Sequence, residues 1–357
     1  MEAANVTTSM TPEAANVTTS ITSLFFTRRE TISDEALVYL GLAFKVIINP
    51  ILAFLGIVAN LINITVFFKM GLSDGVTQNF FILSITDGLM CVFSEINSIT
   101  YILQTQVYSG TSVYVEFVHL ACFLAATFPQ TISLITTVVI AVVRCCCVAM
   151  PLQVKYLLTA RRQLAAILVF STSALSMLLY AFTPIKVAFV HNDRVNSSLP
   201  MFLEIRWTAY TLFTNIFFYI GFVVAIICVI ILTISLNRSS KFRETSTSAK
   251  TTEPSTDTSG QAKEGSKETR IVKTVVFLCI IFILCYMPTL VFALFGQVEP
   301  EFKSTGFYRN ANIFLLMFLE MSMMVNANVN IFVYLLFNSR YRDVFKTVFS
   351  ITAPAQP

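Results

Sequence analysis

Charged residues are scarce in this sequence. Asp, Glu, Lys and Arg together make up 12% of the 357 residues, about half the share found in soluble domains. Histidine occurs only as His119 and His191, which disfavours metal centres built on histidine and catalysis by a histidine base. A water-soluble enzyme, a disordered regulator and a nucleic-acid-binding protein are therefore all disfavoured.

The cysteines also argue against a metal centre, because no pair among the eight has the spacing of a zinc site. All eight lie within apolar stretches or at their edges. Small apolar core residues are the simplest interpretation. For Cys145, Cys146 and Cys147, at the end of a predicted helix, attachment of a palmitoyl chain is a second interpretation.

In place of charge the chain has long apolar runs, with 55% hydrophobic residues and 33 Phe. A helix needs about 20 mostly apolar residues to cross a bilayer. Seven stretches meet this requirement, namely residues 37–68, 79–103, 113–147, 164–190, 207–236, 271–297 and 308–337. They are continuous rather than short and alternating, which disfavours a barrel. The sequence predicts an all-α membrane protein, a seven-transmembrane helix bundle over residues 37–338.

Lys and Arg predict the orientation of this bundle, because cytoplasmic loops carry an excess of them. Most lie after the first, third and fifth spans and in the C-terminal tail. Glycosylation sequons at Asn5, Asn16 and Asn196 fall on the opposite face. We expect a multi-pass plasma-membrane protein in contact with lipid, whose N-terminal tail, residues 1–36, is extracellular, disordered and glycosylated.

Two segments on the cytoplasmic side differ in character. Residues 237–269 are rich in Ser, Thr, Lys and Glu and predict a disordered third intracellular loop, either phosphorylated or a plain flexible linker. Residues 339–350 place Tyr341, Val344 and Phe345 on one helical face. This pattern predicts an amphipathic helix on the inner leaflet, followed by a short cytoplasmic tail, residues 351–357.

Polar side chains inside the predicted spans need a reason, since burying them in lipid is costly. Asn60, Asp87, Ser133, Asn326 and Asn330 are expected at similar depth. One interpretation is a hydrogen-bond network that holds the helices together. The other is a site for a sodium ion at Asp87 and Ser133, because hydroxyl and carboxylate oxygens suit a hard cation.

Two features of the third and sixth spans suggest a moving part. Arg144 ends the third span and can either extend to the interface or pair with Glu268 at the start of the sixth. A charge pair between two helix ends is a plausible switch. In the sixth span, Pro288 removes a backbone hydrogen bond and kinks the helix. Together with Phe282, which precedes it on the same span, Pro288 can form a hinge.

These motifs, in their order and spacing, resemble the rhodopsin-like (class A) G protein-coupled receptors over about residues 37–350. GIVANLINITVF with Asn60, LSITD with Asp87, and Arg144 followed by VAMPLQ resemble motifs of the first three spans. Further matches are Phe282, Cys285, Tyr286 and Pro288 in the sixth span, Asn330 and Tyr334 in the seventh, and the helix 339–350.

The resemblance implies a receptor, not an enzyme, that transmits binding of an extracellular ligand to a heterotrimeric G protein. It implies an activation switch and G protein-coupling region at Arg144, Glu268, Phe282, Pro288, Asn330 and Tyr334. It also places Ser133 and Asn326 at positions of the family's sodium pocket.

Departures from the family pattern keep alternatives open. Val143 stands where an acid usually precedes the arginine, Ile331 replaces a proline, and residues 185–206 lack the cysteine of the usual disulfide. A non-signalling scavenger or partner of another receptor remains an alternative, as does a small transporter, although no two-half repeat is present. The runs KMGLSDGVTQNFFILSITD and CCCVAMPLQVKYLLTARR look most like the expanded chemosensory receptors of molluscs.

The ligand site is predicted from acids in the outer halves of the spans. Ala126 stands where the family's amine receptors carry Asp, which disfavours an amine held at that position. Glu95 and Glu320 lie on neighbouring spans. No basic residue is expected inside the bundle to neutralise them, and Lys45 and Lys186 lie too near the outer rim to be assured partners. We expect the two acids, with Ala126 and Tyr286, to line a cavity for a cationic small molecule or a peptide with a free N-terminus. Structural hydrogen bonding or protonation of the two acids is the alternative.

The orientation predicts a glycosylation pattern. Replacing Asn5, Asn16 and Asn196 together with Gln should abolish a glycosidase-sensitive mass shift, because all three sequons are expected outside the cell. Protease added to intact cells should also remove the tail. Protection of residues 1–35 from that protease would show that the orientation is wrong.

Overall fold

The computed structural model describes residues 32–103, 113–150, 158–182, 186–192, 197–203, 207–249, 259–299, 301–302 and 306–349. Within this part, seven helical segments are long and apolar enough to cross a membrane. The first consists of α2 (Asp34–Gly41), the π-helix η1 (Leu42–Ile48) and α3 (Asn49–Met70); the others are α4 (Gly75–Ile102), α5 (Val113–Ala149), α7 (Ala160–Phe182), α8 (Trp207–Ala249), α9 (Ser259–Val298) and α10 (Arg309–Phe337). The predicted seven-transmembrane helix bundle is confirmed.

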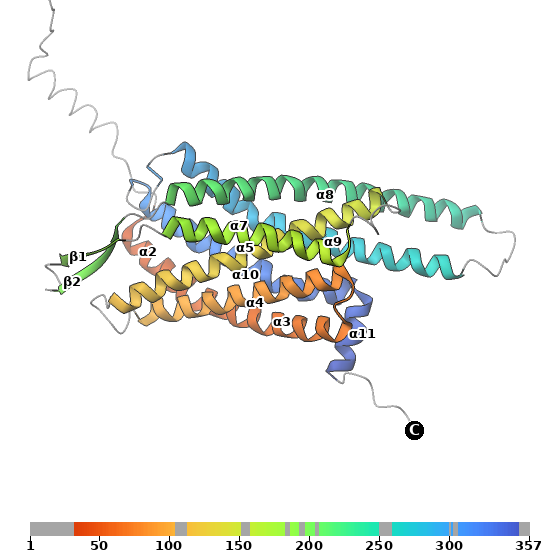
Figure 1. Ribbon diagram of the computed structural model, residues 1–357, viewed down its shortest axis with the longest axis horizontal. Helices are drawn as coiled ribbons and strands as arrows, with labels where there is room; N and C mark the ends of the chain where they lie inside the picture. Colours follow the sequence, from red (N-terminus) through yellow and green to blue (C-terminus); the bar gives the residue numbers. More distant parts are fainter. Residues whose placement is uncertain are drawn as a thin grey trace, which may run out of the picture.

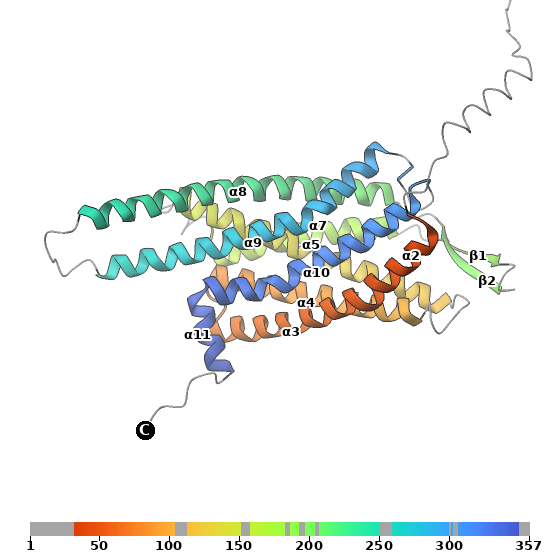
Figure 2. The same ribbon diagram turned by 180° about the vertical axis from the view of Figure 1, so that it is seen from behind.

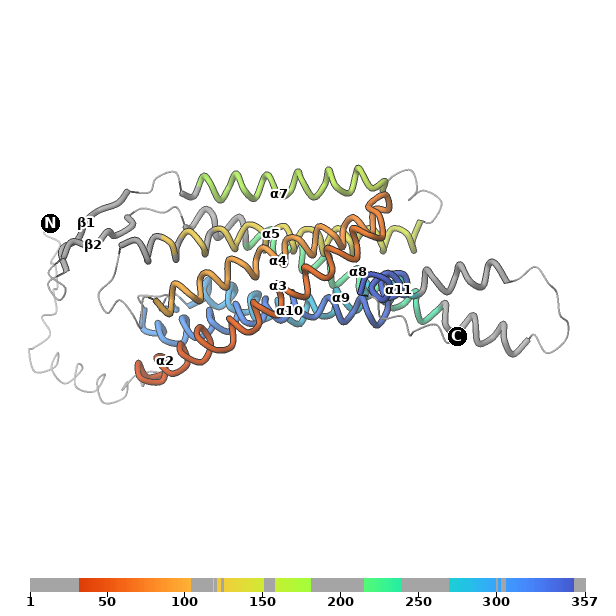
Figure 3. Tube along the Cα trace, turned by 90° about the horizontal axis from the view of Figure 1, so that it is seen from below, coloured from red at the N-terminus to blue at the C-terminus, as the bar shows by residue number. Residues whose placement is uncertain are grey.

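The helices pack side by side along one long axis (Figure 1). Helix α4 packs against α3 and α5, and α10 packs between α9 and α3. The view from behind shows α10 running from the end that holds α2 to the end that holds α11 (Ser339–Val348) (Figure 2). Helix α7 lies at the edge of the bundle (Figure 3). We refer to the two ends as the α2 end and the α11 end.

The surface of the bundle is strongly apolar, as expected for contact with lipid. Phe68 is 65% exposed, Leu284 64% and Leu336 68%. Conversely, the polar side chains Asn60, Asp87, Ser133 and Asn330 are buried. Since hydrocarbon offers no hydrogen-bond partners, polar groups in a spanning helix have to find them inside the bundle.

Capping residues and one glycine set several helix ends. The side chains of Ser33 and Asp74 accept hydrogen bonds from backbone N–H groups in the first turns of α2 and α4, as N-caps do. After α3 the chain turns at Gly71, whose φ is 87°, a value that residues with a Cβ rarely adopt. The short turn before α4 therefore depends on glycine.

A second glycine lets α3 and α4 approach closely. A Cβ added at Gly56 would lie 2.5 Å from Sγ of Cys91 and 3.1 Å from Nδ2 of Asn328. Both distances are shorter than ordinary van der Waals contact. Gly56 therefore fixes the separation of the first, second and seventh spans at this depth, next to the core of Ala53, Met90 and Ala327.

The structure corrects two predicted boundaries. Span four was expected to reach residue 190, but α7 ends at Phe182 and the strand β1 (Lys186–Asn192) pairs antiparallel with β2 (Ser197–Leu203). Pro184 follows the helix end, and proline and the residue before it disfavour helix. Segment 237–269 was expected to be disordered, but α8 continues to Ala249 and α9 begins at Ser259, leaving residues 250–258 outside the described part.

The predicted amphipathic helix is confirmed as α11, and it is anchored to the bundle. Tyr341 is fully buried, and its Oη donates a 2.6 Å hydrogen bond to Oδ1 of Asn63 on α3. Burial raises the pKa of the Tyr341 phenol, so the hydroxyl stays protonated and able to donate. Arg340 Nη2 also donates to the carbonyl of Met70 at 2.7 Å, which satisfies an end carbonyl of α3.

Aromatic rings surround this anchor. We call Phe67, Phe80, Tyr334 and Tyr341 the aromatic cluster. The ring centroid of Tyr334 lies 5.0 Å from those of both Phe67 and Phe80 and 5.4 Å from that of Tyr341. Such distances are within the range of favourable ring contacts. The cluster joins α3, α4, α10 and α11 at the α11 end.

Tyr341→Phe should therefore destabilise the protein while keeping the ring contacts. The variant leaves the buried Asn63 Oδ1 without its short hydrogen bond, at an expected cost of about 0.6–2 kcal/mol, the range for hydrogen bonds between membrane helices. Thermal unfolding of the purified protein in detergent measures the effect. The matched control is Tyr39→Phe, since Tyr39 is 64% exposed. Equal midpoints for the two variants would contradict the anchoring role of Tyr341.

Candidate functional site

One polar group in the interior of the bundle centres on a buried carboxylate. Asp87 of α4 is 1% exposed. Its Oδ1 accepts a hydrogen bond from Ser133 Oγ of α5 at 2.6 Å, and its Oδ2 accepts one from Asn330 Nδ2 of α10 at 2.8 Å. We call these three residues the Asp87 site. The predicted cluster therefore exists and joins three helices.

Helical spacing explains why these residues meet. On α10, Asn326, Asn330 and Tyr334 follow one another at intervals of four, and all three are buried, as expected for residues on one helical face. On α4, Asp87 and Ser94 are seven residues apart and both are buried. The buried stripe of each helix thus presents polar groups to the same interior.

Burying a carboxylate is costly unless it is well bonded. No basic side chain pairs with Asp87 in the described part of the chain, and its two hydrogen bonds come from neutral donors. Charge-assisted bonds of this kind are stronger than neutral ones. The oxygens of Asp87 and Ser133 are also suitable ligands for a hard cation, so the residues present fit the predicted sodium ion.

Asn326 takes no part in these bonds. It is 5% exposed, but no hydrogen bond joins it to Asp87 among the described residues. The predicted polar cluster thus includes hydrogen bonds among Asp87, Ser133 and Asn330, and the membership of Asn326 stays a prediction. Its position one turn before Asn330 on the same helix leaves it nearby but not bonded.

Asn60 begins a second polar path on α3. Its Nδ2 donates to the carbonyls of Gly56 at 2.9 Å and Ala327 at 3.2 Å. Its Oδ1 accepts a long 3.5 Å hydrogen bond from Asn63 Nδ2. Oδ1 of Asn63 in turn accepts a hydrogen bond from the hydroxyl of Tyr341. The predicted importance of Asn60 thus has a physical basis: the path ties α3 to α10 and to α11. Sequence reasoning missed Asn63, although the spacing of three from Asn60 was a usable signal.

The predicted switch residues are only partly testable. Arg144 is half-buried near the end of α5, and the side chain of Glu268, on α9, lies outside the described residues, so their pairing stays a prediction. Phe282 is 1% exposed and its ring centroid lies 4.6 Å from that of Tyr286. Pro288 lies inside α9. The ring pair and the proline therefore follow one another along the same helix.

At the α2 end, Lys45 of η1 forms an ion pair with Glu320 of α10. The two side chains are 15% and 20% exposed, and Ser94 Oγ contributes a long 3.5 Å hydrogen bond to Glu320 Oε1. The expectation that Glu320 has no basic partner inside the bundle is wrong. The signal was present in the sequence, as a single Lys within the first apolar run.

Glu95 differs from Glu320. It is half-buried, and its Oε2 atom is buried and accepts no hydrogen bond within the described residues. No contact joins it to Glu320 there; its neighbour Ser94 makes that connection. Of the other predicted ligand residues, Ala126 is half-buried on α5, whereas Tyr286 is 2% exposed and packs against Phe218 and Phe282. Tyr286 is thus a core residue in this packing.

Further buried polar groups at the α2 end lack partners within the described residues. Asn49, the first residue of α3, is fully buried, and neither of its side-chain polar atoms is hydrogen-bonded in the described part. Oδ1 of Asn97 and Oγ of Ser98 on α4 are also buried without a hydrogen-bond partner in the described part. Sequence reasoning missed Asn49. Unsatisfied buried polar groups are few in proteins, and each needs an explanation.

The predicted glycosylation sites cannot be located. Asn5, Asn16 and Asn196 lie outside the described residues. All eight cysteines lie within the described part and are free. Cys145, Cys146 and Cys147 are half-buried in the last turns of α5, and their lipidation stays a prediction.

Comparison with known families gives one match. The family model described as 7 transmembrane receptor (rhodopsin family) matches residues 59–334, well over half of the chain. The matched range contains Asn60, the Asp87 site, Arg144 and Tyr334. No curated protein matches the chain.

The Lys45–Glu320 pair should contribute measurably to stability. Lys45→Gln leaves the poorly exposed Glu320 carboxylate uncompensated, at an expected cost of about 1–3 kcal/mol, between the values for exposed and buried pairs. Glu320→Gln added to this variant should recover most of the loss. Thermal unfolding of the two single variants and the double variant measures the coupling. Lys69→Gln, at an exposed position, is the control, and strictly additive losses would argue against the pair.

Proposed function

Because the chain belongs to the rhodopsin family of seven-transmembrane receptors, we propose that it transmits the binding of an extracellular ligand to a heterotrimeric G protein. Members of this family are receptors rather than enzymes. The observation that carries the proposal is the Asp87 site, where one buried carboxylate bonds to residues of two other helices. Such a site makes the packing of α4, α5 and α10 interdependent.

A receptor needs two packings that a ligand binds with different affinity. The hydroxyl of Tyr334 supports the existence of a second packing. It is buried without a hydrogen-bond partner in the described part of the chain, which costs about 1–3 kcal/mol. A packing of α10 that gave this hydroxyl a partner would recover that cost, so Tyr334 is poised to move with α10.

Sodium would favour one of these packings. In our proposal a sodium ion binds the oxygens of Asp87 and Ser133 in the resting state, because it neutralises a buried carboxylate that has only neutral donors. The ion would compete with packings in which α10 moves away from α4. Asn330, which already donates to Asp87, links the ion to α10.

In our proposal the α11 end of the bundle faces the cytoplasm. The positive charge bias of the sequence supports this orientation. Arg144 at the end of α5 and Glu268 on α9 would restrain each other in the resting state, and separation of α5 and α9 would open the surface that a G protein binds. Pro288 and the Phe282–Tyr286 ring pair supply the hinge on α9.

We propose a cationic ligand at the α2 end, revised from the sequence-based expectation. Glu320 already has a cation in Lys45, whereas no basic side chain pairs with Glu95 among the described residues. An ammonium or guanidinium group would therefore bind Glu95, whose buried Oε2 accepts no hydrogen bond within the described residues. The chemosensory role indicated by sequence resemblance stays a prediction.

A ligand screen that reads nucleotide exchange on a panel of G proteins tests this function. Basic amino acid derivatives and peptides with a free N-terminus should yield an agonist. Glu95→Gln should weaken its potency about tenfold or more, since a charge-assisted bond is worth roughly 1.5–3 kcal/mol. The control is Glu35→Gln, because Glu35 is an exposed acid at the same end. Only anionic agonists, or unchanged potency in Glu95→Gln, would refute the ligand class.

Three further variants in the same assay test the coupling. Arg144→Ala should lower agonist-stimulated exchange, and Glu268→Ala should raise basal exchange a few-fold, because a surface ion pair holds about 0–1 kcal/mol. Agonist affinity should fall as sodium rises, and Asp87→Asn should abolish that dependence. A receptor that binds its ligand but activates no G protein in the panel would support the non-signalling alternative instead.

A further inference from the structure

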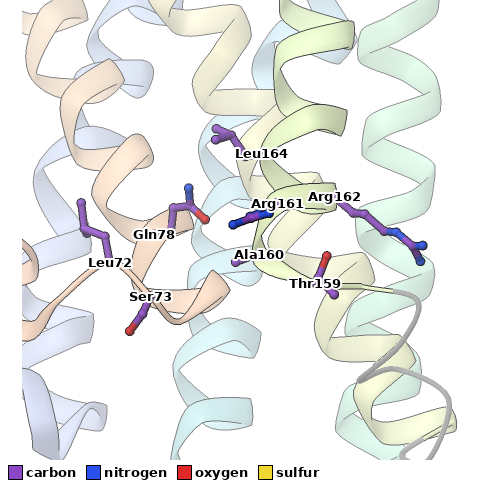
Figure 4. Close-up of a pocket in the computed structure, with 8 residues that line it drawn as sticks. All are labelled: Leu72, Ser73, Gln78, Thr159, Ala160, Arg161, Arg162 and Leu164. Atoms are coloured by element: carbon purple, nitrogen blue, oxygen red, sulfur yellow. The ribbon is translucent and has the colours of Figure 1, made fainter.

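A cleft separates the first turns of α4 and α7 at the α11 end. It is lined by Leu72, Ser73, Gln78, Thr159, Ala160, Arg161, Arg162 and Leu164 (Figure 4). The lining combines one apolar residue on each side, Leu72 and Leu164, with hydroxyl, amide and guanidinium groups. We call it the α4–α7 cleft. None of the residues assigned above to ligand binding, sodium or G protein coupling belongs to it.

The positive charge of the cleft comes from α7. The guanidinium of Arg161 is directed toward Gln78, across the cleft, whereas the side chain of Arg162 points to the opposite side (Figure 4). Arg161 is exposed and forms no ion pair within the described residues. The first turn of α7 begins at Ala160, and its N–H groups have no partners within the helix. An arginine and a helix N-terminus together favour an anion.

Asp74, the acid that follows Ser73 in the chain, forms no ion pair with Arg161 within the described residues. The carboxylate of Asp74 accepts hydrogen bonds from the N–H of Thr77 at 3.3 Å and from its hydroxyl at 3.2 Å. It is thereby held as the cap of α4. The cleft thus keeps its positive character despite an acid next to Ser73.

The two walls of the cleft are held in a fixed relation. Gln163, 5% exposed, accepts a 2.7 Å hydrogen bond from Asn79 Nδ2 of α4 and donates one of 2.8 Å to the carbonyl of Leu158. Gly75 lies against the same amide, because an added Cβ would come within 2.8 Å of it. A binding site formed in advance loses less entropy when it takes up a ligand.

A buried acceptor indicates more than a simple anion. Oε1 of Gln78 is buried and accepts no hydrogen bond in the described part of the chain. Phosphate carries acceptors, so it cannot satisfy this atom, whereas a hydroxyl can. The hydroxyls of Ser73 and Thr159 add further donors and acceptors to the lining. The cleft therefore suits a molecule that carries both phosphate and hydroxyl groups.

We propose that the α4–α7 cleft binds a phosphorylated inositol. Its phosphate would meet Arg161 and the first N–H groups of α7, and a ring hydroxyl would donate to Gln78 Oε1. The source is either the headgroup of an inner-leaflet phosphoinositide or a free inositol phosphate. The lipid source rests on the orientation given under the proposed function, because only that orientation puts the cleft at the cytoplasmic membrane surface.

Native mass spectrometry of the purified full-length protein in detergent tests the proposal. The probes are dioctanoyl phosphatidylinositol 4-phosphate, dioctanoyl phosphatidylserine and free inositol 1,4-bisphosphate. The phosphoinositide should bind in preference to phosphatidylserine. Arg161→Gln should weaken it about tenfold, because one charge-assisted contact is lost. Arg270→Gln, with the same change of charge at an exposed position of α9 outside the cleft, should keep it within about twofold.

Each result has a definite meaning. Gln78→Leu should reduce the preference for phosphatidylinositol 4-phosphate over dioctanoyl phosphatidic acid, which has no ring hydroxyls. Binding of the free bisphosphate alone would support the cleft with a soluble ligand. Equal losses in Arg161→Gln and Arg270→Gln, or no preference over phosphatidylserine, would overturn the proposal in favour of a general surface charge. Arg161→Lys, with an unchanged unfolding midpoint, should recover part of the binding. None of these outcomes depends on G protein activation, so the receptor function is tested separately.

Discussion

The bonding of one buried carboxylate constrains the whole bundle. The hydrocarbon core of a membrane offers Asp87 no water as a hydrogen-bond donor. Its two carboxylate oxygens therefore depend on hydrogen bonds from Ser133 and Asn330. These bonds set the positions of α5 and α10 along α4. Asn60 of α3 is linked to α10 in the same way, by its hydrogen bond to the carbonyl of Ala327. Asn63 of α3 is linked to α11 by its hydrogen bond with Tyr341. Apolar packing alone would leave these helices freer to slide, because lipid tails compete equally well for apolar side chains.

The two ends of the bundle differ in how completely their buried polar groups are hydrogen-bonded. At the α11 end the aromatic cluster is closely packed, and most of its neighbours are apolar. At the α2 end, polar side-chain atoms of Asn49, Asn97 and Ser98 are buried without partners in the described part, and the Lys45–Glu320 ion pair at the same end is partly exposed to solvent. Helix α10 spans both ends and carries Glu320, Asn330 and Tyr334 in order. A change in the bonding of Glu320 therefore acts on the same rigid element that bonds Asp87, which is a physical route for coupling between the ends.

Much of this architecture could be predicted from the sequence, for identifiable reasons. Seven apolar runs exceed the bilayer thickness, and Asp87, Ser133 and Asn330 stand out because polar residues in such runs are rare. Lys45 was expected to lie too near the outer rim to be an assured partner of Glu320, but it lies in the π-helix η1, whose wider turn changes which face of the span a residue occupies. The helical parts of 237–269 were missed because polar composition argues for solvent exposure but does not by itself exclude helix. Asn49 was missed although it lies well inside the predicted first span, where burying a polar side chain needs a reason.

The contact at Gly56 has an evolutionary consequence. A side chain at position 56 would collide with the sulfur of Cys91 and the amide of Asn328, so the three positions cannot diverge independently. A lineage that acquired alanine at 56 would have to shorten or reorient the residue at 91, or else move α3 away from α4. Relatives of this receptor should therefore show paired substitutions at 56 and 91, and an isolated change at 56 should mark a chain whose first two helices pack differently.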